Sequence, residues 1–242
     1  MKRIGKSSEL LWLLGITLVA LGVSLCSKTN LGVSMIAAPA FILYDVINPL
    51  WNGFSVGVAE YLFQGLILVL LCIIVRKFNW RYLLAFAVAV IYGYVLDLFL
   101  WLFDGITAQA LWQRWLLLIA GDTITALGVA CFFKTYMPLQ VYELFVAEIS
   151  KNFKFSINKT KWSFDISLLA ISVMLAVVFF AGKDSFNIVS ITSSSFHNIG
   201  LGTIVTTLIN SPIIAIMGKL LNKLFDPTPC FKKLHSVLKI EN

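Results

Sequence analysis

A few acidic and amide side chains lie inside otherwise apolar stretches of the sequence, where they could bind a solute, an ion or a proton. Asp122 lies near the middle of one stretch, and Asp97 lies in another. Gln64 lies one helical turn from Glu60 in a third. Ionisable side chains within a membrane span are costly and are functional candidates by default. We expect Asp122, Glu60 and Asp97 to bind an ion or proton, and Asp122 and Gln64 to contact a solute. The alternative is that they bond neighbouring helices together.

A proline follows two polar residues in the middle of the last apolar stretch. The three consecutive residues are Asn210, Ser211 and Pro212. Proline removes a helical hydrogen bond and frees a backbone carbonyl group. The side chains of Asn210 and Ser211 could bond either to this carbonyl group or to a ligand. We include both side chains in the predicted solute site, with helix bonding again as the alternative.

A Lys-Thr pair occurs twice, each time at the end of an apolar stretch. Lys28 and Thr29 precede Asn30, and Lys134 and Thr135 occur in the second copy. One interpretation is that each lysine extends to the lipid headgroups. The other is that lysine and the N-terminus of the following short helix bind an anion together. The second interpretation adds all five residues to the predicted solute site.

Sequence patterns of the common catalytic and cofactor sites are missing. The sequence has no phosphate-binding loop, zinc helix, nucleophile triad or paired catalytic carboxylates. Its four cysteines lack metal-site spacing, and its two histidines are far apart. We therefore expect no enzyme activity, no cofactor and no metal.

The composition predicts an integral membrane protein. Hydrophobic residues make up 59% of the 242 residues and charged residues 13%, whereas soluble domains carry about 25% charged residues. The net charge of +7 comes from residues at the ends of apolar stretches, so it indicates membrane orientation and not nucleic-acid binding. The main expected partner is the lipid bilayer.

Six apolar stretches are long enough to span a bilayer. They are residues 10–26, 56–75, 83–103, 111–133, 162–181 and 199–221. Lysine and arginine gather before the first stretch, after the second, after the fourth (Lys151, Lys154, Lys159 and Lys161) and after the sixth. The positive-inside rule then predicts that both termini are cytoplasmic. We expect the serine-rich segment 183–198 on the opposite side and an interfacial, amphipathic tail over 223–242, chiefly Cys230–Ile240.

An internal repeat organises these stretches. Residues 10–29 align without a gap with residues 116–135, and the identical pairs include Gly15/Gly121, Gly22/Gly128, Lys28/Lys134 and Thr29/Thr135. A second match aligns FSVGVAEYLFQ (54–64) with FSINKTKWSFD (155–165). Because each unit has three spans, the second copy must enter the membrane from the opposite face.

The predicted fold is therefore an all-α polytopic membrane protein in a single domain, residues 1–242, with two inverted three-helix repeats. We place repeat one at about 8–104 and repeat two at about 111–222. Segments 30–47 and 136–150 follow the first span of each repeat and contain prolines. We expect each segment to form a short interfacial or re-entrant helix.

Two stretches resemble a known family. ALGVSLCSKTNLGVS, followed by a proline-containing segment, and GLGTIVTTLINSPI in the last span are similar to the bacterial YczE/YitT-type integral membrane proteins, most of which have no assigned function. The second copy departs from the glycine-rich pattern at KTYMPLQ. The resemblance implies a bacterial cytoplasmic (inner) membrane and no particular substrate.

The inverted repeat favours a secondary transporter or permease for a small polar or anionic solute, with its site near the bilayer midplane. One alternative is the substrate-binding membrane subunit of an energy-coupled transporter, which works with a separate ATPase. Another is a membrane assembly or regulatory protein that transports nothing. The sequence leaves open whether the chain forms a homo-oligomer or binds a partner membrane subunit.

Overall fold

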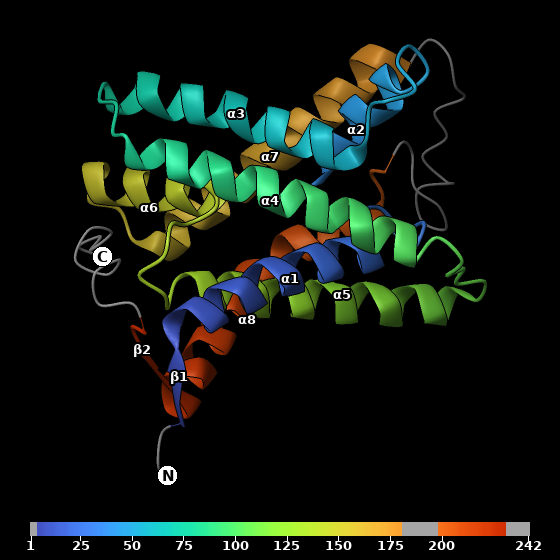
Figure 1. The fold of residues 1–242 in the computed structure, drawn as a ribbon. Helices are drawn as coiled ribbons and strands as arrows, with labels where there is room; N and C mark the ends of the chain where they lie inside the picture. The colour runs from blue at the N-terminus through green and yellow to red at the C-terminus, as the bar shows by residue number, and fades with distance from the viewer. Residues whose placement is uncertain (1–3, 181–197, 231–242) are drawn as a thin grey trace.

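The structure is a computed structural model that describes residues 4–180 and 198–230. Within these residues the chain forms eight helices and two four-residue strands (Figure 1). The elements are β1 (Ile4–Ser7), α1 (Ser8–Ser27), α2 (Ala38–Ile47), α3 (Val56–Val75), α4 (Arg81–Leu102), α5 (Leu111–Phe132), α6 (Val141–Phe153), α7 (Ile157–Phe180), α8 (Leu201–Leu224) and β2 (Phe225–Thr228). The all-α prediction is confirmed apart from the two short strands.

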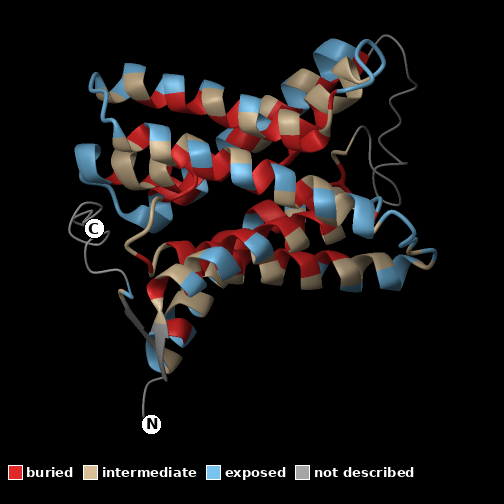
Figure 2. Cartoon of the chain, viewed as in Figure 1, coloured by how far each residue is buried: buried red, intermediate tan, exposed pale blue. Residues whose placement is uncertain are grey.

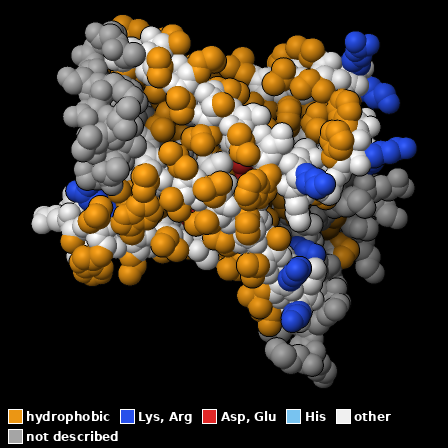
Figure 3. Space-filling view, turned by 180° about the vertical axis from the view of Figure 1, so that it is seen from behind, with side chains coloured by type: hydrophobic (Ala, Val, Ile, Leu, Met, Phe, Trp, Pro, Cys, Tyr) orange, Lys and Arg blue, Asp and Glu red, His pale blue; other side chains and the backbone are white. Residues whose placement is uncertain are grey.

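Six of the helices, α1, α3, α4, α5, α7 and α8, are long and apolar enough to cross a membrane. Side chains such as Leu66, Leu98 and Leu116 are exposed on them, whereas Asp122 is fully buried. Seen from behind, hydrophobic side chains cover the middle of the molecule, and lysines and arginines lie mainly toward its right-hand end (Figure 3). This distribution is the reverse of that in a soluble protein, and it fits a surface that contacts lipid.

The chain begins and ends its described part at the same end of the molecule. Strand β1 pairs in parallel with β2, with Ile4 opposite Phe225. The predicted tail therefore starts as the last turn of α8 and a strand, and its remainder, 231–242, lies outside the described residues, as does most of the serine-rich segment.

Helix α7 begins at Ile157, five residues before the predicted start of the fifth span. Ser156 initiates it, because its hydroxyl accepts a hydrogen bond from the backbone N–H of Lys159 at 3.4 Å. Placing Lys161 in a cytoplasmic loop was wrong. The lysine lies inside the helix and is buried.

The two short helices are buried more deeply than interfacial helices would be. In α2 the five residues from Ala38 to Ile42 are buried. Pro39 lies in the first turn, where a backbone N–H group would have no partner within the helix, so proline costs no hydrogen bond there. In α6, Tyr142, Glu143 and Val146 are buried. The two helices lie toward opposite ends of the molecule (Figure 1), and each packs against both α3 and α7.

Helices α1 and α5 cross through glycines at the centre of the molecule. A Cβ atom added to Gly15 would lie 3.2 Å from the carbonyl oxygen of Gly128, and one added to Gly121 would lie 2.8 Å from that of Gly22. The helices are therefore antiparallel. Each contact also has its counterpart, because Gly15 corresponds to Gly121 and Gly22 to Gly128 in the repeat. Such reciprocity is the property of an isologous, two-fold contact.

The remaining helices repeat this reciprocity. Helix α4 packs against α1 and α3, and α8 packs against α5 and α7. Ser55 begins α3 with the same side-chain cap that Ser156 provides in α7. The buried faces of α3 and α7 also coincide at an offset of 101 residues, in the pairs Ala59/Thr160, Glu60/Lys161, Phe63/Phe164, Gln64/Asp165, Ile67/Leu168 and Leu71/Ser172.

Candidate functional site

A group of polar side chains is buried where α3, α5, α6, α7 and α8 meet. The buried polar cluster consists of Glu60 and Gln64 from α3, Asp122 from α5, Tyr142 and Glu143 from α6, Lys161 and Asp165 from α7, and Asn210 and Ser211 from α8. None of these residues is more than 6% exposed. Buried segments line the inner faces of the helices throughout the molecule (Figure 2). Buried polar groups are expensive unless they are bonded, so this cluster requires an explanation.

The second half of the chain contributes a bonded ion pair. The Nζ of Lys161 lies 2.6 Å from Oδ1 of Asp165, one helical turn away. The hydroxyl group of Ser211 donates a hydrogen bond of 3.2 Å to Oδ2 of the same carboxylate. Asp165 is thus held by α7 and α8 together.

Glu60 and Gln64, the first-half equivalents of Lys161 and Asp165, and two residues of α6 have no such bonds. Both carboxylate oxygens of Glu60 and both amide atoms of Gln64 are buried and have no hydrogen-bond partner among the described residues. The same is true of the Tyr142 hydroxyl group and of Oε2 of Glu143. Glu60 interacts electrostatically with Gln64, Tyr142 and Glu143, but none of them reaches hydrogen-bond geometry with it.

Asp122 and Asn210 complete the set. Neither oxygen of Asp122 and neither amide atom of Asn210 has a hydrogen-bond partner among the described residues. Asp122 interacts electrostatically with Asp165 and Lys161. All ten buried side-chain nitrogen and oxygen atoms without a partner in the described part of the chain belong to this cluster. Unsatisfied groups are few in native proteins and typically mark functional or hydrated sites.

The cluster is rich in negative charge. It holds four carboxyl groups, of Glu60, Asp122, Glu143 and Asp165, and one ammonium group, of Lys161. Burial raises the pKa of Glu143 to about 7, while Lys161 opposes the rise and Asp165 adds to it. Glu143 therefore titrates near neutral pH.

A cavity of about 520 Å³ leads from one end of the molecule to the ion pair. It lies among α5, α6, α7 and α8, and Lys161 and Ser211 form part of its wall. Lys134, Glu148 and Asn158 line it toward the end at which α5 ends and α7 begins. This cavity gives the cluster a route to solvent.

A second cavity, of about 390 Å³, lies at the opposite end among α1, α2, α3 and α4. Its wall repeats that of the first cavity. The equivalent pairs are Lys28/Lys134, Phe41/Leu144, Tyr44/Ala147, Asp45/Glu148 and Val56/Ile157. In the described residues, however, no member of the buried polar cluster lines this second cavity. The first cavity thus reaches the cluster, and the second one does not.

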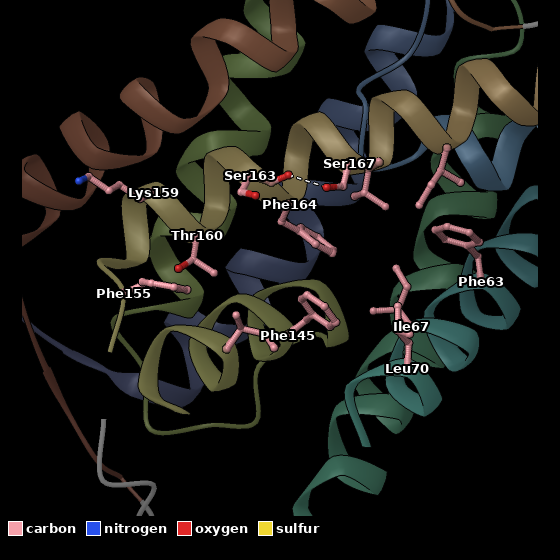
Figure 4. Close-up of a pocket in the computed structure, with 13 residues that line it drawn as sticks. Phe63, Ile67, Leu70, Phe145, Phe155, Lys159, Thr160, Ser163, Phe164 and Ser167 are labelled. Carbon is pink, nitrogen blue, oxygen red and sulfur yellow. Dashed lines mark hydrogen bonds between the residues drawn. The ribbon is translucent and has the colours of Figure 1, made fainter. Parts of the chain in front are cut away.

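A third cavity, of about 500 Å³, lies between α3, α6 and α7 and has a different character (Figure 4). Phe63, Ile67 and Leu70 from α3 lie on one side of it, and Phe145 lies on the other, with its ring stacked against that of Phe164. Polar groups are few, with Lys159 and Thr160 at one edge. Its lining suits a hydrocarbon chain and not an ion or a polar solute.

Several predicted site residues lie outside the cluster. Asp97 accepts hydrogen bonds from the Ser55 hydroxyl group at 2.6 Å and from the Gly57 backbone N–H at 2.8 Å, so it caps the start of α3. Lys28 forms an ion pair of 3.1 Å with Asp104. These contacts hold the end of the molecule together and bring neither residue to the cluster.

The Lys-Thr pairs terminate α1 and α5. The hydroxyl groups of Thr29 and Thr135 donate hydrogen bonds to the equivalent carbonyl oxygens of Cys26 and Phe132, at 2.8 and 3.1 Å. Lys134 binds the side chain of Asn222. Asn30, with a φ of 54°, adopts the left-handed conformation that turns the chain toward α2. Each residue has a structural task at a helix end.

The predicted site did not include Tyr142, Glu143, Lys161 or Asp165. A signal for Lys161 was present, because it stands four residues before Asp165 and aligns with Glu60. Glu143 lies inside segment 136–150, whose pattern predicted a short interfacial or re-entrant helix, and nothing in that pattern indicated that the start of the helix is buried.

Comparison with known proteins adds a family. The model of DUF6198, a family of unknown function, matches residues 6–219. The chain belongs to this family. No curated protein and no solved structure matches the chain significantly. The match covers the whole buried polar cluster, and because the family has no known activity, function has to be argued from the cluster itself.

Proposed function

We propose that the protein is a membrane transport protein, a secondary transporter or permease, whose small polar solute binds at the buried polar cluster between two inverted halves. The observation that carries this proposal is the pair of equivalent cavities, of which one reaches the cluster and the other does not. A protein with one site and two related access routes has the arrangement that alternating access requires.

The reciprocal contacts support the inverted repeat on which this mechanism depends. The α1–α5 crossing and the matched faces of α3 and α7 relate the two halves residue by residue. If the halves exchanged conformations, the cavity among α1–α4 would deepen to Glu60 while the cavity among α5–α8 closed over Lys161. The cluster itself would stay in place, as it does in other inverted-repeat transporters.

The difference in packing at the two cavities indicates how one is closed. Gly57 at the start of α3 lies against the backbone of Gly93 in α4, where an added Cβ atom would overlap the carbonyl oxygen. Asn158, its equivalent in α7, lines the open cavity instead. Separation of α3 from α4 at this glycine contact is the movement that would open the second route.

Orientation follows from the charge distribution. With both termini in the cytoplasm, as the positive-inside rule predicts, the cavity that reaches the cluster faces the cytoplasm. The resemblance to YczE/YitT-type proteins supports a bacterial cytoplasmic membrane as the location.

The proposal can be tested without knowing the solute. Single cysteines replace Tyr44 or Ala147, which occupy equivalent places in the two cavities, in a background without other cysteines. In proteoliposomes of one orientation, a membrane-impermeant thiol reagent should reach the two positions from opposite faces. Variants that hold the protein with one cavity or the other open to the cluster should raise the labelling rate at one position and lower it at the other. Rates that never change in opposition would argue for a membrane assembly or regulatory protein, and co-purification with an ATPase would favour an energy-coupled subunit.

A further inference from the structure

Four side chains of the cluster carry buried oxygen atoms that have no hydrogen-bond partner among the described residues. They are the two carboxylate oxygens of Glu60, the amide oxygen Oε1 of Gln64, the hydroxyl oxygen of Tyr142 and Oε2 of Glu143. All four residues are at most 2% exposed. Glu60 and Gln64 come from α3, and Tyr142 and Glu143 come from the first turn of α6. Two helices thus supply five unpartnered oxygens to one region.

The ammonium group in the cluster is already engaged. Lys161 bonds Asp165 at 2.6 Å and also interacts with Asp122 and Glu143. Protons alone would satisfy the five oxygens poorly, because each proton joins only one donor to one acceptor. A small cation can contact several oxygens at once, and oxygen ligands are the ones that hard cations prefer.

The repeat shows what kind of group fits this position. Lys161 occupies in α7 the place of Glu60 in α3, and Asp165 occupies that of Gln64. In the second half, therefore, the chain places its own ammonium group among the carboxylates. In the first half the same position carries the carboxyl group of Glu60, and α3 contributes no ammonium group beside it.

We infer that Glu60, Gln64, Tyr142 and Glu143 form a binding site for a small monovalent cation, either an inorganic ion or the ammonium group of a small amine. The inference deepens the proposed function and rests on it only for the claim that the cation is carried across the membrane. It replaces the expected anionic solute with a cationic one. The two carboxyl groups match one or two positive charges. The site is not of the kind in which three or more His, Cys, Asp or Glu side chains hold a metal ion, because no such group occurs among the described residues.

Binding is measured on the purified protein in detergent. Thermal unfolding is followed at constant ionic strength while chloride of the bulky N-methylglucamine cation is replaced by NaCl, KCl or methylammonium chloride. We expect at least one of the three to raise the unfolding temperature with saturation, as a ligand of the native state does. The inorganic and the organic arms identify the source of the charge.

Two variants locate the site. Glu60→Gln removes one carboxylate and relieves repulsion from Glu143, so it should fold, and Tyr142→Phe removes one oxygen. Each should weaken the apparent affinity, by more than about tenfold for Glu60→Gln. Glu9→Gln makes the same change in charge outside the cluster, at the start of α1, and should retain the affinity of the unaltered protein.

The inference is overturned if the three cations act alike with no saturation, if Glu60→Gln binds as tightly as the unaltered protein, or if the phosphate or sulfate salt of N-methylglucamine, with no small cation present, gives a saturable shift. Uptake of the same cations into proteoliposomes separates the two proposals. Binding without uptake would support the cation site and contradict transport. Movement of a neutral or anionic solute that does not depend on the cation would support transport and contradict the cation site.

Discussion

Helices α3 and α7 resemble each other closely, and they differ most in the polar side chains that they contribute to the cluster. Both begin with a serine cap, bury the same face and pack against both short helices. Yet α7 carries the bonded pair Lys161–Asp165, while α3 carries Glu60 and Gln64 without partners. The two helices are alike in outline and differ in these polar residues, so that α7 holds its own counter-charge and α3 does not.

Removal of the internal counter-charge should have the largest effect on stability. Lys161→Met would leave Asp165 and Asp122 buried without a positive neighbour, and breaking a buried pair in this way costs about 3–5 kcal/mol. The double variant Lys161→Met/Asp165→Leu should recover most of the loss, since both charges are then gone. Chemical or thermal unfolding in detergent measures both. A single variant as stable as the parent would mean that the ion pair does not balance the cluster.

The glycine crossing should tolerate no side chain. In Gly22→Ala the new methyl group would overlap the backbone of Gly121 and the side chain of Thr125, and overpacking of this kind costs about 1–3 kcal/mol. Gly128→Ala, its equivalent in the repeat, should lose a similar amount, because the new methyl group would overlap Val19 and the backbone of Gly15. Gly218→Ala in α8 is the matched control, because nothing lies within 4 Å of the added Cβ atom. Unequal losses at Gly22 and Gly128 would weaken the two-fold relation between the halves.

Asp122 distinguishes a working site from a structural one. If it takes part in coupling, Asp122→Asn should abolish cation uptake into proteoliposomes while changing the unfolding temperature little, because the amide keeps the shape of the side chain. Asp122→Leu tests the other role, since a residue that only bonds helices would lose stability and not uptake. Full activity of Asp122→Asn with unchanged pH dependence would remove Asp122 from the mechanism.

The most gradual effect concerns pH. Burial raises the pKa of Glu143 from 4.5 to about 7, so between these values the native carboxyl group is protonated and the unfolded one is not. The contribution of Glu143 to stability is therefore fully present below pH 4.5 and is lost as the pH rises through about 7, by at most about 1.4 kcal/mol per pH unit. Glu143→Gln should remove this slope from unfolding curves recorded between pH 4.5 and 8. An unchanged slope would assign it to another group.

The spans and part of the site could be predicted from the sequence, because hydropathy and charge act locally. Asp122, Gln64 and Asn210 stood out as polar residues in apolar stretches, and the structure places all three in the cluster. Lys161 did not stand out, because a lysine next to a basic loop looks like part of that loop. Its burial depends on an additional turn at the start of α7 and on the packing of α7 against α6 and α8, which the sequence pattern does not show.

The short helices illustrate the same limit. Their amphipathic pattern predicts one apolar face, but it does not say whether that face meets lipid or protein. In α6 the answer depends on α3 and α7, which enclose Tyr142 and Glu143 from two sides. The Lys-Thr pairs are the opposite case, because a local contact explains why they recur. In each pair the threonine hydroxyl group donates a hydrogen bond to a carbonyl group at the end of the helix.

The central claim is that two equivalent cavities take turns in reaching one buried cluster. Spin labels on Lys151 and Gly218 would report the width of the cavity that now reaches Lys161, and labels on Asp45 and Leu100 that of the other. Electron–electron resonance distances should show two populations for each pair in membranes, with the cation shifting both. We predict that one distance shortens as the other lengthens, in equal proportion. Distances that stay fixed, or that change in the same direction, would contradict the account.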